Sequence, residues 1–240
     1  MKNKIFISVI IPVYNESKRI QNIQIFFDYF KKQKYTSEII IVNDGSNDNT
    51  LNLLNSLKKR LGFKLITYNK NRGKGFAIKN GVKNSLGEHI LFTDIDLSTP
   101  LKEIDKFIPH FKNFDIVIGT RKNKDALLLN RQPFLREYLG KGFTLLSQII
   151  LDLKISDFTC GFKCFSRKSA LGIFPLMKVN RWGFDSEVLF ISKRRNYKIK
   201  EVSVIWKNDL QSKVKFPQDI IRSLKELIEI RINNSKHFYD

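Results

Sequence analysis

The stretch Ile5–Val13, "IFISVIIPV", is a nearly unbroken apolar run rich in β-branched residues. Such a run is typical of a strand buried on both faces, as in a parallel sheet packed between helices. A second run of this kind, "EIIIVND" (Glu38–Asp44), follows a segment with helical spacing of apolar residues, Ser17–Lys32. Alternation of strands and helices in this way predicts a parallel sheet covered by helices.

The same alternation continues as far as Thr120. We expect further strands at Phe63–Tyr68, His89–Asp94 and Phe114–Thr120, and helices between Asn47 or Asp48 and Gly62, over Gly73–Asn84 and over Leu101–Phe111. Asn47 or Asp48 would cap the first of these helices, and Gly62 would end it. The predicted fold class is α/β, with a Rossmann-like, mostly parallel central sheet flanked by helices.

The pattern is looser after Arg121. Lys122–Tyr138 is basic and rich in turn residues and is predicted to be a mobile loop. Beyond it we expect a helix at Gly142–Leu153, a strand at Cys160–Phe165, a helix starting near Gly183, a strand at Ile199–Trp206 and an amphipathic helix at Phe216–Ile232 with Ile220, Leu224, Leu227 and Ile228 on one face. No linker or repeat divides the chain, so we predict one domain over residues 1–215, with a C-terminal helix and tail at 216–240.

Charge is the main signal in the composition. The chain has 43 Lys and Arg against 23 Asp and Glu, a net charge of +20. This favours a polyanionic partner: an acidic membrane surface, a phosphorylated substrate or nucleic acid. A general bias towards Lys, Asn and Ile is the alternative explanation. Most of the aromatic residues lie in apolar runs and are not interleaved with Lys and Arg, which makes a nucleic-acid-binding protein a distant alternative.

The sequence also argues against several other classes. Two cysteines, Cys160 and Cys164, and three scattered histidines are too few for a zinc site, and both thiols are expected to be reduced, with a disulfide between them as the alternative. No segment reaches the roughly 20 uninterrupted apolar residues of a membrane-spanning helix. The apolar N-terminus is β-branched and is interpreted as a first strand, not a signal peptide.

Polar clusters follow five of the predicted strands. They are Tyr14–Glu16, Asn43–Ser46, Asn69–Gly75, Asp94–Ser98 and Thr120–Asn123. Parallel sheets bind their ligands at the carboxyl ends of the strands, so these clusters predict one shared site.

Asp94 and Asp96, in "FTDIDLSTP", are the strongest candidates within that site. Strand alternation would place both carboxylates on one face, where they repel each other unless a cation lies between them. Two carboxylates suit Mg²⁺ or Mn²⁺, which usually complete their coordination with substrate phosphates. A solvated turn is the alternative.

Two other clusters suggest a nucleotide. Asn71–Gly75, "NRGKG", places two glycines and two cations at the start of a helix, an arrangement that attracts phosphate. It is not a Walker A loop, and no G-x-G-x-x-G follows the first strand, which argues against a dinucleotide-dependent oxidoreductase. Asp44 can accept hydrogen bonds from a base or ribose, or it can serve a turn.

Taken together, these motifs resemble those of a known protein family. "SVIIPVYNE", "IIIVNDGSNDNT", "NRGKGFAIKNGV", "FTDIDLSTP" and "VIGTRKN" resemble, in order and spacing, the inverting family-2 glycosyltransferases with the GT-A fold. "DFTCGFKCF", "RWGFDSEVLF" and "EVSVIWKNDLQSKV" extend the resemblance to about residue 215, towards the polyprenyl-phosphate (dolichyl-phosphate) sugar synthases. The most similar branch is that of the dolichyl-phosphate β-glucosyltransferases.

The resemblance implies a role for each matching residue. Nucleotide-sugar contacts would come from Pro12, Tyr14, Glu16, Asp44, Gly45 and Lys74; the divalent metal and the donor diphosphate would be held by Asp94 and Asp96 with Ser98 nearby; and phosphate groups of acceptor and donor would be bound by Arg121, Arg131 and Arg136. If the reaction needs a general base, Asp185, Asp157 and Glu187 are the candidates. The alternative for Asp157 is a hydrogen bond within a loop, and for Glu187 a charge on a helix surface.

The implied reaction is attack of a polyprenyl or dolichyl phosphate on the anomeric carbon of a nucleotide-sugar, with Mg²⁺ or Mn²⁺ as cofactor. UDP-glucose is the favoured donor and GDP-mannose its competitor, while a glycan acceptor is the alternative reaction. Many members of this group carry C-terminal transmembrane helices, which we do not expect here. The chain would then reach the cytoplasmic face of the membrane as a peripheral protein, through its charge, its C-terminal helix or a membrane partner protein.

Overall fold

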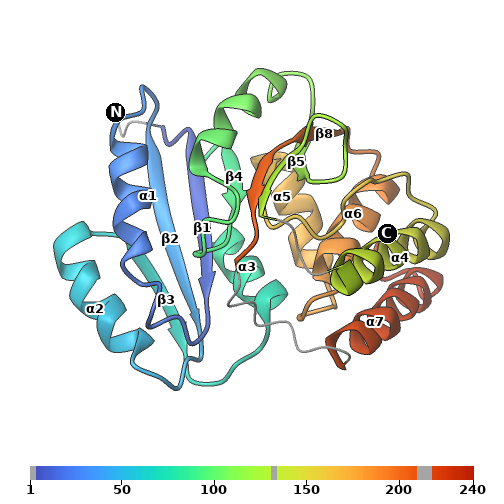
Figure 1. Ribbon diagram of the computed structural model, residues 1–240, viewed down its shortest axis with the longest axis horizontal. Coiled ribbons are helices and arrows are strands. Elements are labelled where there is room, and N and C mark those ends of the chain that lie inside the picture. Colours follow the sequence, from blue (N-terminus) through green and yellow to red (C-terminus); the bar gives the residue numbers. More distant parts are fainter. Residues whose placement is uncertain (1–3, 131–133, 210–217) are drawn as a thin grey trace.

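A seven-stranded sheet forms the centre of the molecule (Figure 1). The computed structural model describes residues 4–130, 134–209 and 218–240. The strands, in the order β3-β2-β1-β4-β7-β5-β8, are β1 (Ile7–Val13), β2 (Ser37–Asp44), β3 (Lys64–Tyr68), β4 (His89–Phe92), β5 (Ile116–Thr120), β7 (Lys163–Ser166) and β8 (Ile199–Ser203). In this sheet, β7 pairs antiparallel with β4 and β5, and the other neighbours are parallel. The predicted α/β fold with a mostly parallel sheet is confirmed.

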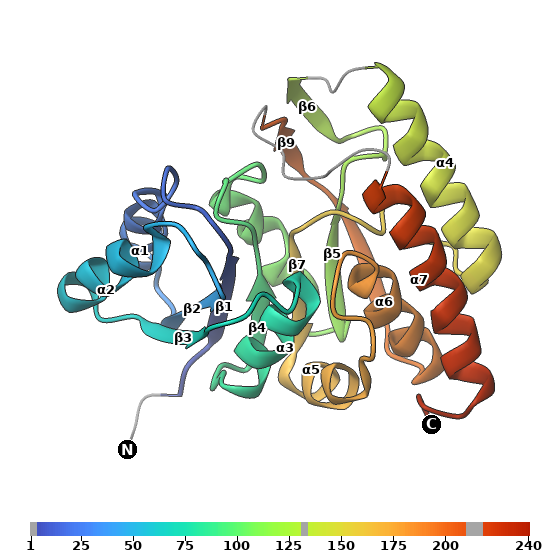
Figure 2. The ribbon, with the colours of Figure 1, turned by 90° about the horizontal axis from the view of Figure 1, so that it is seen from below.

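Both faces of the sheet are covered, as the continuous apolar runs predict. In β1, Val9 and Ile11 belong to one hydrophobic cluster and Ile10 to the other, which is the alternation expected of a strand. One cluster lies under α1 and α2, and the other under α3, α5 and α6 (Figure 2). The helices are α1 (Asn22–Lys31), α2 (Thr50–Leu61), α3 (Lys74–Lys83), α4 (Phe134–Leu151), α5 (Arg167–Ile173), α6 (Phe184–Arg194) and α7 (Gln218–Ser235).

Two predicted helices differ in the structure. The helix expected over Ser17–Lys32 begins only at Asn22, and the residues before it form hydrogen-bonded turns. The side chains of Ser46, Asp48 and Thr50 bind the backbone N–H groups of residues 15–17. The segment predicted as one α-helix over Leu101–Phe111 is instead two short 3₁₀ helices, η1 (Leu101–Lys106) and η2 (Ile108–His110). Pro109 lacks the N–H that a continuous helix would need at that position.

The predictions beyond Arg121 need further corrections. The segment expected to be a loop contains strand β6 (Leu127–Asn130), and α4 starts eight residues before the predicted Gly142. The strand expected over Ile199–Trp206 is broken at Val204 into β8 and β9 (Ile205–Lys207). Strand β9 leaves the main sheet and pairs with β6 in a separate two-stranded sheet. The short helix η3 (Phe174–Leu176) follows α5.

The C-terminal helix α7 lies beside α4 and contacts α6 (Figures 1 and 2). Leu227 and Ile230 are buried in the core and Leu224 packs against it, but Ile228 is exposed, so the prediction that Ile228 shares one face with Leu224 and Leu227 is wrong. The side chain of Ile220 lies outside the described part of the chain. Among the described residues, no helix has both the length and the apolar character needed to cross a membrane.

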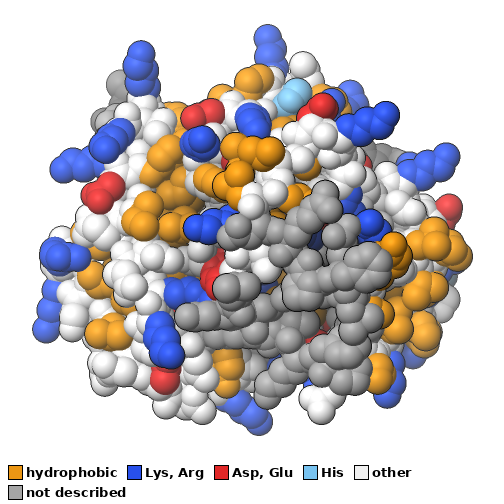
Figure 3. Space-filling view, in the orientation of Figure 1, with side chains coloured by type: hydrophobic (Ala, Val, Ile, Leu, Met, Phe, Trp, Pro, Cys, Tyr) orange, Lys and Arg blue, Asp and Glu red, His pale blue; other side chains and the backbone are white. Residues whose placement is uncertain are grey.

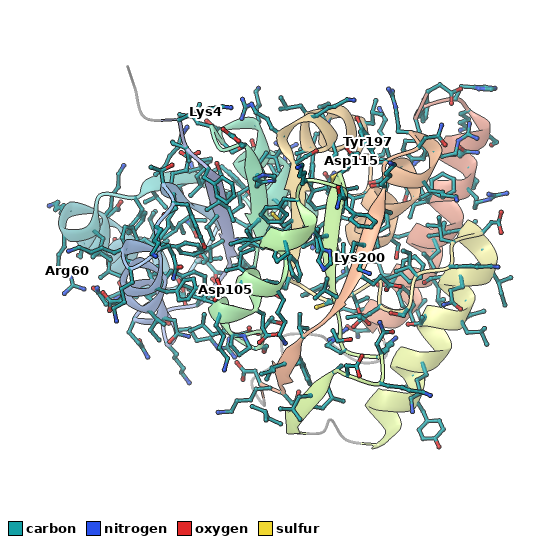
Figure 4. The ribbon with its side chains drawn as sticks, turned by 90° about the horizontal axis from the view of Figure 1, so that it is seen from above. Lys4, Arg60, Asp105, Asp115, Tyr197 and Lys200 are labelled. Atoms are coloured by element: carbon teal, nitrogen blue, oxygen red, sulfur yellow. The ribbon has the colours of Figure 1, made fainter. Side chains whose placement is uncertain are left out.

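Two carboxylates labelled in Figure 4 fix neighbouring elements. The Tyr29 hydroxyl on α1 donates to Asp105 on η1 at 3.1 Å. The backbone N–H of Lys198 donates to Asp115, just before β5, at 2.9 Å. The first contact joins α1 to η1, and the second joins the starts of the parallel strands β5 and β8, at the edge of the sheet opposite to the one where these strands end.

Candidate active site

The Asp94–Asp96 pair lies in a turn just after β4. The strand ends at Phe92, so strand alternation does not place the two carboxylates; the turn does, and Leu97 within it has a positive φ of 56°. The N–H of Ser98 donates to Asp96 at 2.9 Å. Burial, followed by the charge of Asp94, raises the pKa of Asp96. A raised pKa means that the ionised carboxylate of Asp96 is disfavoured, and a cation bound at this turn would stabilise it.

A small pocket opens over this pair. Its lining residues are Thr93, Asp94, Asp96, Ser98, Thr99, Gly161 and Trp206. Three of the predicted metal-site residues therefore share one cavity with hydroxyl groups and an indole ring. Gly161 and Trp206 were missed by sequence reasoning, since neither carries a charge and both lie far from Asp94 in the chain.

Lys74, at the start of α3, places a cation beside the pair. Its ammonium lies 2.6 Å from Asp94 Oδ1. Burial alone would lower the pKa of Lys74, but the carboxylates of Asp94 and Asp185 outweigh it and raise the pKa. Trp182 lies 5.7 Å from the ammonium. Lys74 is thus a permanently charged group beside the carboxylates, where the negative charge of a diphosphate would be placed.

Asp44 organises the loop that leads to Lys74. Its carboxylate accepts hydrogen bonds from the Asn71 side chain at 2.8 Å and from the N–H groups of Arg72 at 2.8 Å and Gly73 at 2.9 Å. This contribution was not predicted, because 27 to 29 residues separate the partners. Gly45, with φ of +64°, packs so closely on the backbone of Lys70 that a side chain there would clash. Asp44 and Gly45 thereby position the N-terminus of α3.

The predicted nucleotide residues of the first strand lie on an adjacent loop. Pro12 is within β1, and Tyr14 and Glu16 follow it. Glu16 forms a 2.8 Å ion pair with Arg19, which also binds Asp209 at 2.7 Å. Asn15 connects this loop to the loop after β2: its N–H donates to Ser46, and its side chain accepts from the N–H of Asn47.

Arg121, after β5, is held by a buried carboxylate. Its Nε and Nη2 donate to the two oxygens of Asp157 at 2.7 and 2.8 Å, and Nη2 also donates to Thr159 at 2.9 Å. Burial would raise the pKa of Asp157, but Arg121 outweighs burial and lowers it. Asp157 therefore has little basicity, which favours its interpretation as a structural partner. The Arg121 guanidinium lies 5.3 Å from the ring of Trp206, at the edge of the pocket.

The side chains of the other two predicted arginines lie outside the described part of the chain. Arg131 lies outside the described residues. Arg136 lies in the first turn of α4, and the described part of the structure does not include its side chain.

The two remaining candidate bases are buried at the start of α6. Asp185 is bound by Lys163 at 2.5 Å, and burial raises its pKa. Glu187 is fully buried and accepts hydrogen bonds from the N–H groups of Lys178 and Val179 and from the Tyr239 hydroxyl. The interpretation of Glu187 as a surface charge is therefore wrong; it ties the C-terminus to the domain.

The residues present fit a divalent metal with few protein ligands. Asp94, Asp96 and Ser98 offer only oxygen atoms, the donors that Mg²⁺ and Mn²⁺ prefer. In the described ranges, no group of three or more His, Cys, Asp or Glu side chains is placed to enclose a metal alone. Such a site would need substrate oxygens to complete the coordination. Both cysteines are free and buried, as expected.

The fold and this site define a class of protein. Residues 8–174 match the model of the family described as glycosyl transferase family 2, and the chain belongs to this family. The chain is 35% identical to a dolichyl-phosphate beta-glucosyltransferase of Dictyostelium discoideum and 33% identical to that of Saccharomyces cerevisiae, in each case over 95% of this chain and 75% of the relative. The Homo sapiens dolichyl-phosphate beta-glucosyltransferase is 32% identical, over 94% and 75%. The prediction of a hexosyltransferase is confirmed.

Solved structures support the same fold. Glucosyl-3-phosphoglycerate synthase of Mycobacterium tuberculosis, in complex with Mn²⁺, UDP and glucosyl-3-phosphoglycerate, superposes with a TM-score of 0.67 over 95% of this chain and 79% of that one, at 16% identity. TarS of S. aureus, in complex with UDP-GlcNAc, gives a TM-score of 0.61 over 96% of this chain and 67% of TarS, at 18% identity. The predicted GT-A architecture is confirmed.

Proposed function

We propose that this chain transfers glucose from UDP-glucose to dolichyl phosphate or a related polyprenyl phosphate, using Mg²⁺ or Mn²⁺. The observation that carries the proposal is the constellation of Asp94, Asp96 and Lys74 at the carboxyl edge of the sheet. The donor and acceptor are inferred from relatives that are named dolichyl-phosphate beta-glucosyltransferases. Solved structures of this fold that contain UDP with Mn²⁺ or Mg²⁺ support the nucleotide and the metal.

The proposed reaction is a single displacement at the anomeric carbon. An oxygen of the lipid phosphate forms the new bond to that carbon, the bond to the diphosphate oxygen breaks, and UDP leaves with the electron pair. The product has the opposite anomeric configuration. A phosphate monoester is anionic at neutral pH, so a strong general base is unnecessary, in keeping with the engagement of Asp157 by Arg121 and of Asp185 by Lys163.

The chain's own residues would catalyse mainly by positioning and by charge. Asp94 and Asp96 would hold the metal, which neutralises negative charge on the leaving diphosphate. Lys74 would lie beside the diphosphate, and the loop fixed by Asp44 would keep the N-terminus of α3 directed at the phosphates. Fixed charges of this kind stabilise the developing negative charge without reorganising during the reaction.

Arginines are proposed to bind the acceptor phosphate. Arg121 lies at the edge of the pocket near Trp206, and α4 carries Arg136 in its first turn. Arg131 and Arg136 would provide planar, bidentate phosphate donors, and Arg121, whose Nε and Nη2 bind Asp157 and Thr159, would donate through Nη1. Asp157 would hold the Arg121 guanidinium in a fixed orientation for this purpose.

A lipid acceptor requires contact with a bilayer. The neighbouring helices α4 and α7 carry exposed apolar side chains, such as Ile149, which is 68% exposed, and Ile221 and Ile228. Lys and Arg side chains are spread around the face seen in Figure 3, an arrangement that suits an anionic membrane surface better than one nucleic-acid groove. We propose peripheral attachment at the cytoplasmic face, with or without a membrane partner protein.

The test is a transfer assay with a panel of donors and acceptors. Radiolabelled UDP-glucose and GDP-mannose are each incubated with dolichyl phosphate or a sugar acceptor, with Mn²⁺, with Mg²⁺ or with EDTA. The proposal predicts metal-dependent label in the lipid phase from UDP-glucose alone. Label from GDP-mannose would overturn the donor assignment, and transfer only to the sugar would overturn the lipid acceptor.

A further inference from the structure

Lys163 is a charged residue buried at the centre of the sheet. It lies on β7, opposite Phe92 of β4 and Ile118 of β5, and none of its surface is exposed. A buried ammonium group is unfavourable unless it is fully paired, and an apolar side chain of similar volume often stabilises a core as well or better. Core packing alone therefore does not explain a lysine at this position.

The Lys163 ammonium has three partners close to the site. It donates to the backbone carbonyls of Phe158 at 2.9 Å and Cys160 at 2.7 Å, and it binds the carboxylate of Asp185 at 2.5 Å. The two carbonyls belong to the turn formed by residues 157–161. A single ammonium group thus fixes this turn to the start of α6.

The 157–161 turn contacts both Arg121, which is proposed to bind the acceptor phosphate, and Asp94, which is proposed to bind the metal. At one end, Asp157 and Thr159 hold the guanidinium of Arg121. At the other end, Gly161 packs directly on the carboxylate of Asp94, so closely that a methyl group would overlap Asp94 Oδ2. Any shift of the turn would therefore move the acceptor-side arginine and the metal-side carboxylate together.

The third partner of Lys163, the carboxylate of Asp185, interacts with the charged groups of the proposed metal site. Asp185 interacts electrostatically with Lys74, whose pKa it helps to raise, and Lys74 binds Asp94. Lys163 thus touches no substrate atom in the proposed reaction, yet it is linked to Asp94 both through the turn and through Asp185.

We propose that Lys163 is a positioning residue for sugar transfer, holding the 157–161 turn so that Arg121 and Asp94 are fixed relative to each other. This inference rests on the proposed function. A displacement of about 1 Å in a reacting group lowers the rate by about 100-fold. Loss of the Lys163 ammonium should therefore lower turnover in a protein that remains folded.

The test compares Lys163→Met with a matched control, Lys79→Met. Lys79 also donates to two backbone carbonyls, those of Pro175 at 3.0 Å and Met177 at 2.9 Å, but these lie away from the 157–161 turn. For each variant, kcat and KM for UDP-glucose, the melting temperature and the hydrogen exchange of amides 157–161 are measured.

We expect Lys163→Met to lower kcat by about 10- to 100-fold and to accelerate exchange in the turn, while Lys79→Met keeps the wild-type kcat. A folded Lys163→Met protein with wild-type kcat and exchange would overturn the proposal. So would a loss of kcat in Lys79→Met as large as that in Lys163→Met, since the effect would then be a general one of removing a clamped lysine.

Two further measurements keep the proposal testable. If Lys163→Met does not fold, Lys163→Met/Asp185→Asn, which removes both buried charges, is compared with Asp185→Asn alone; equal kcat in the two would overturn the proposal. If the wild-type protein transfers no sugar to dolichyl phosphate, the proposed function fails. Exchange in the turn then decides the inference about Lys163 independently, with unchanged exchange overturning it.

Discussion

Gly161→Ala is the substitution whose effect can be worked out most directly from the structure. A methyl group at Gly161 would lie 3.0 Å from Asp94 Cγ, would overlap Oδ2, and would lie 3.5 Å from the Lys74 ammonium. Carbon atoms in contact are normally about 3.5–4.0 Å apart, so the Asp94 carboxylate has to move by about 0.5–1 Å. Asp94 is partly exposed and can move into solvent without disturbing the core.

The expected result is therefore lost activity in a stable protein. A displacement of this size should lower kcat/KM by up to about 100-fold, or about 2.7 kcal/mol of transition-state stabilisation. The assay is transfer of glucose from UDP-glucose to dolichyl phosphate with Mn²⁺, together with the melting temperature. We also expect the Mn²⁺ concentration needed for half-maximal activity to rise.

Gly142→Ala is the matched control, since a methyl group at this helical glycine meets no atom within 4 Å. It should leave kcat/KM unchanged and stabilise α4 by about 0.5–1 kcal/mol. The reasoning is refuted if Gly161→Ala retains wild-type kcat/KM and metal dependence, because Asp94 would then not need its observed position.

Asp44→Ala should lower the free energy of unfolding by about 1–3 kcal/mol and raise the KM for the nucleotide-sugar, because the N–H groups of Arg72 and Gly73 lose their acceptor and the loop before Lys74 is released. Denaturant unfolding measures the first effect and titration of the donor measures the second. An unchanged KM would count against the role of this loop. Asp157→Asn should make the stability of the fold less dependent on pH in the acid range. Arg121 lowers the pKa of Asp157 despite burial, so the pair stabilises the fold above the unfolded pKa of about 3.9, and this contribution is lost as the pH falls through the folded value. Melting temperatures between about pH 5 and pH 2 test this, and a decline as steep as that of the wild type would contradict it.

The fold was predictable where local sequence determines the structure. Continuous apolar runs such as Ile5–Val13 identify buried parallel strands, and the polar residues after them mark the ligand edge. Gly62 ends α2 in the left-handed conformation, as its position indicates. Local periodicity was misleading at Leu101–Phe111, where Pro109 interrupts a segment whose apolar spacing resembles that of an α-helix.

The site was predictable only in part. Asp94 and Asp96 carry their own signal, because two carboxylates one residue apart after a strand are chemically distinctive. The contacts of Asp44 with residues 71–73, of Arg121 with Asp157 and of Lys163 with Asp185 join residues 22 to 36 positions apart, and no local pattern specifies such pairs. The lysine within the apolar segment "CGFKCF" was the one local sign that a buried charge had to be paired.

The central claim is that Asp94 and Asp96 hold a divalent metal and, with it, a nucleoside diphosphate. The most direct measurement is calorimetric titration of UDP into the wild-type protein and into Asp96→Ala, with and without Mn²⁺, alongside melting temperatures. The account predicts UDP binding that requires Mn²⁺ in the wild type and is lost in Asp96→Ala, whose melting temperature stays within about 4 °C of the wild type. Equal UDP affinity without metal, or in a folded Asp96→Ala protein, would contradict it.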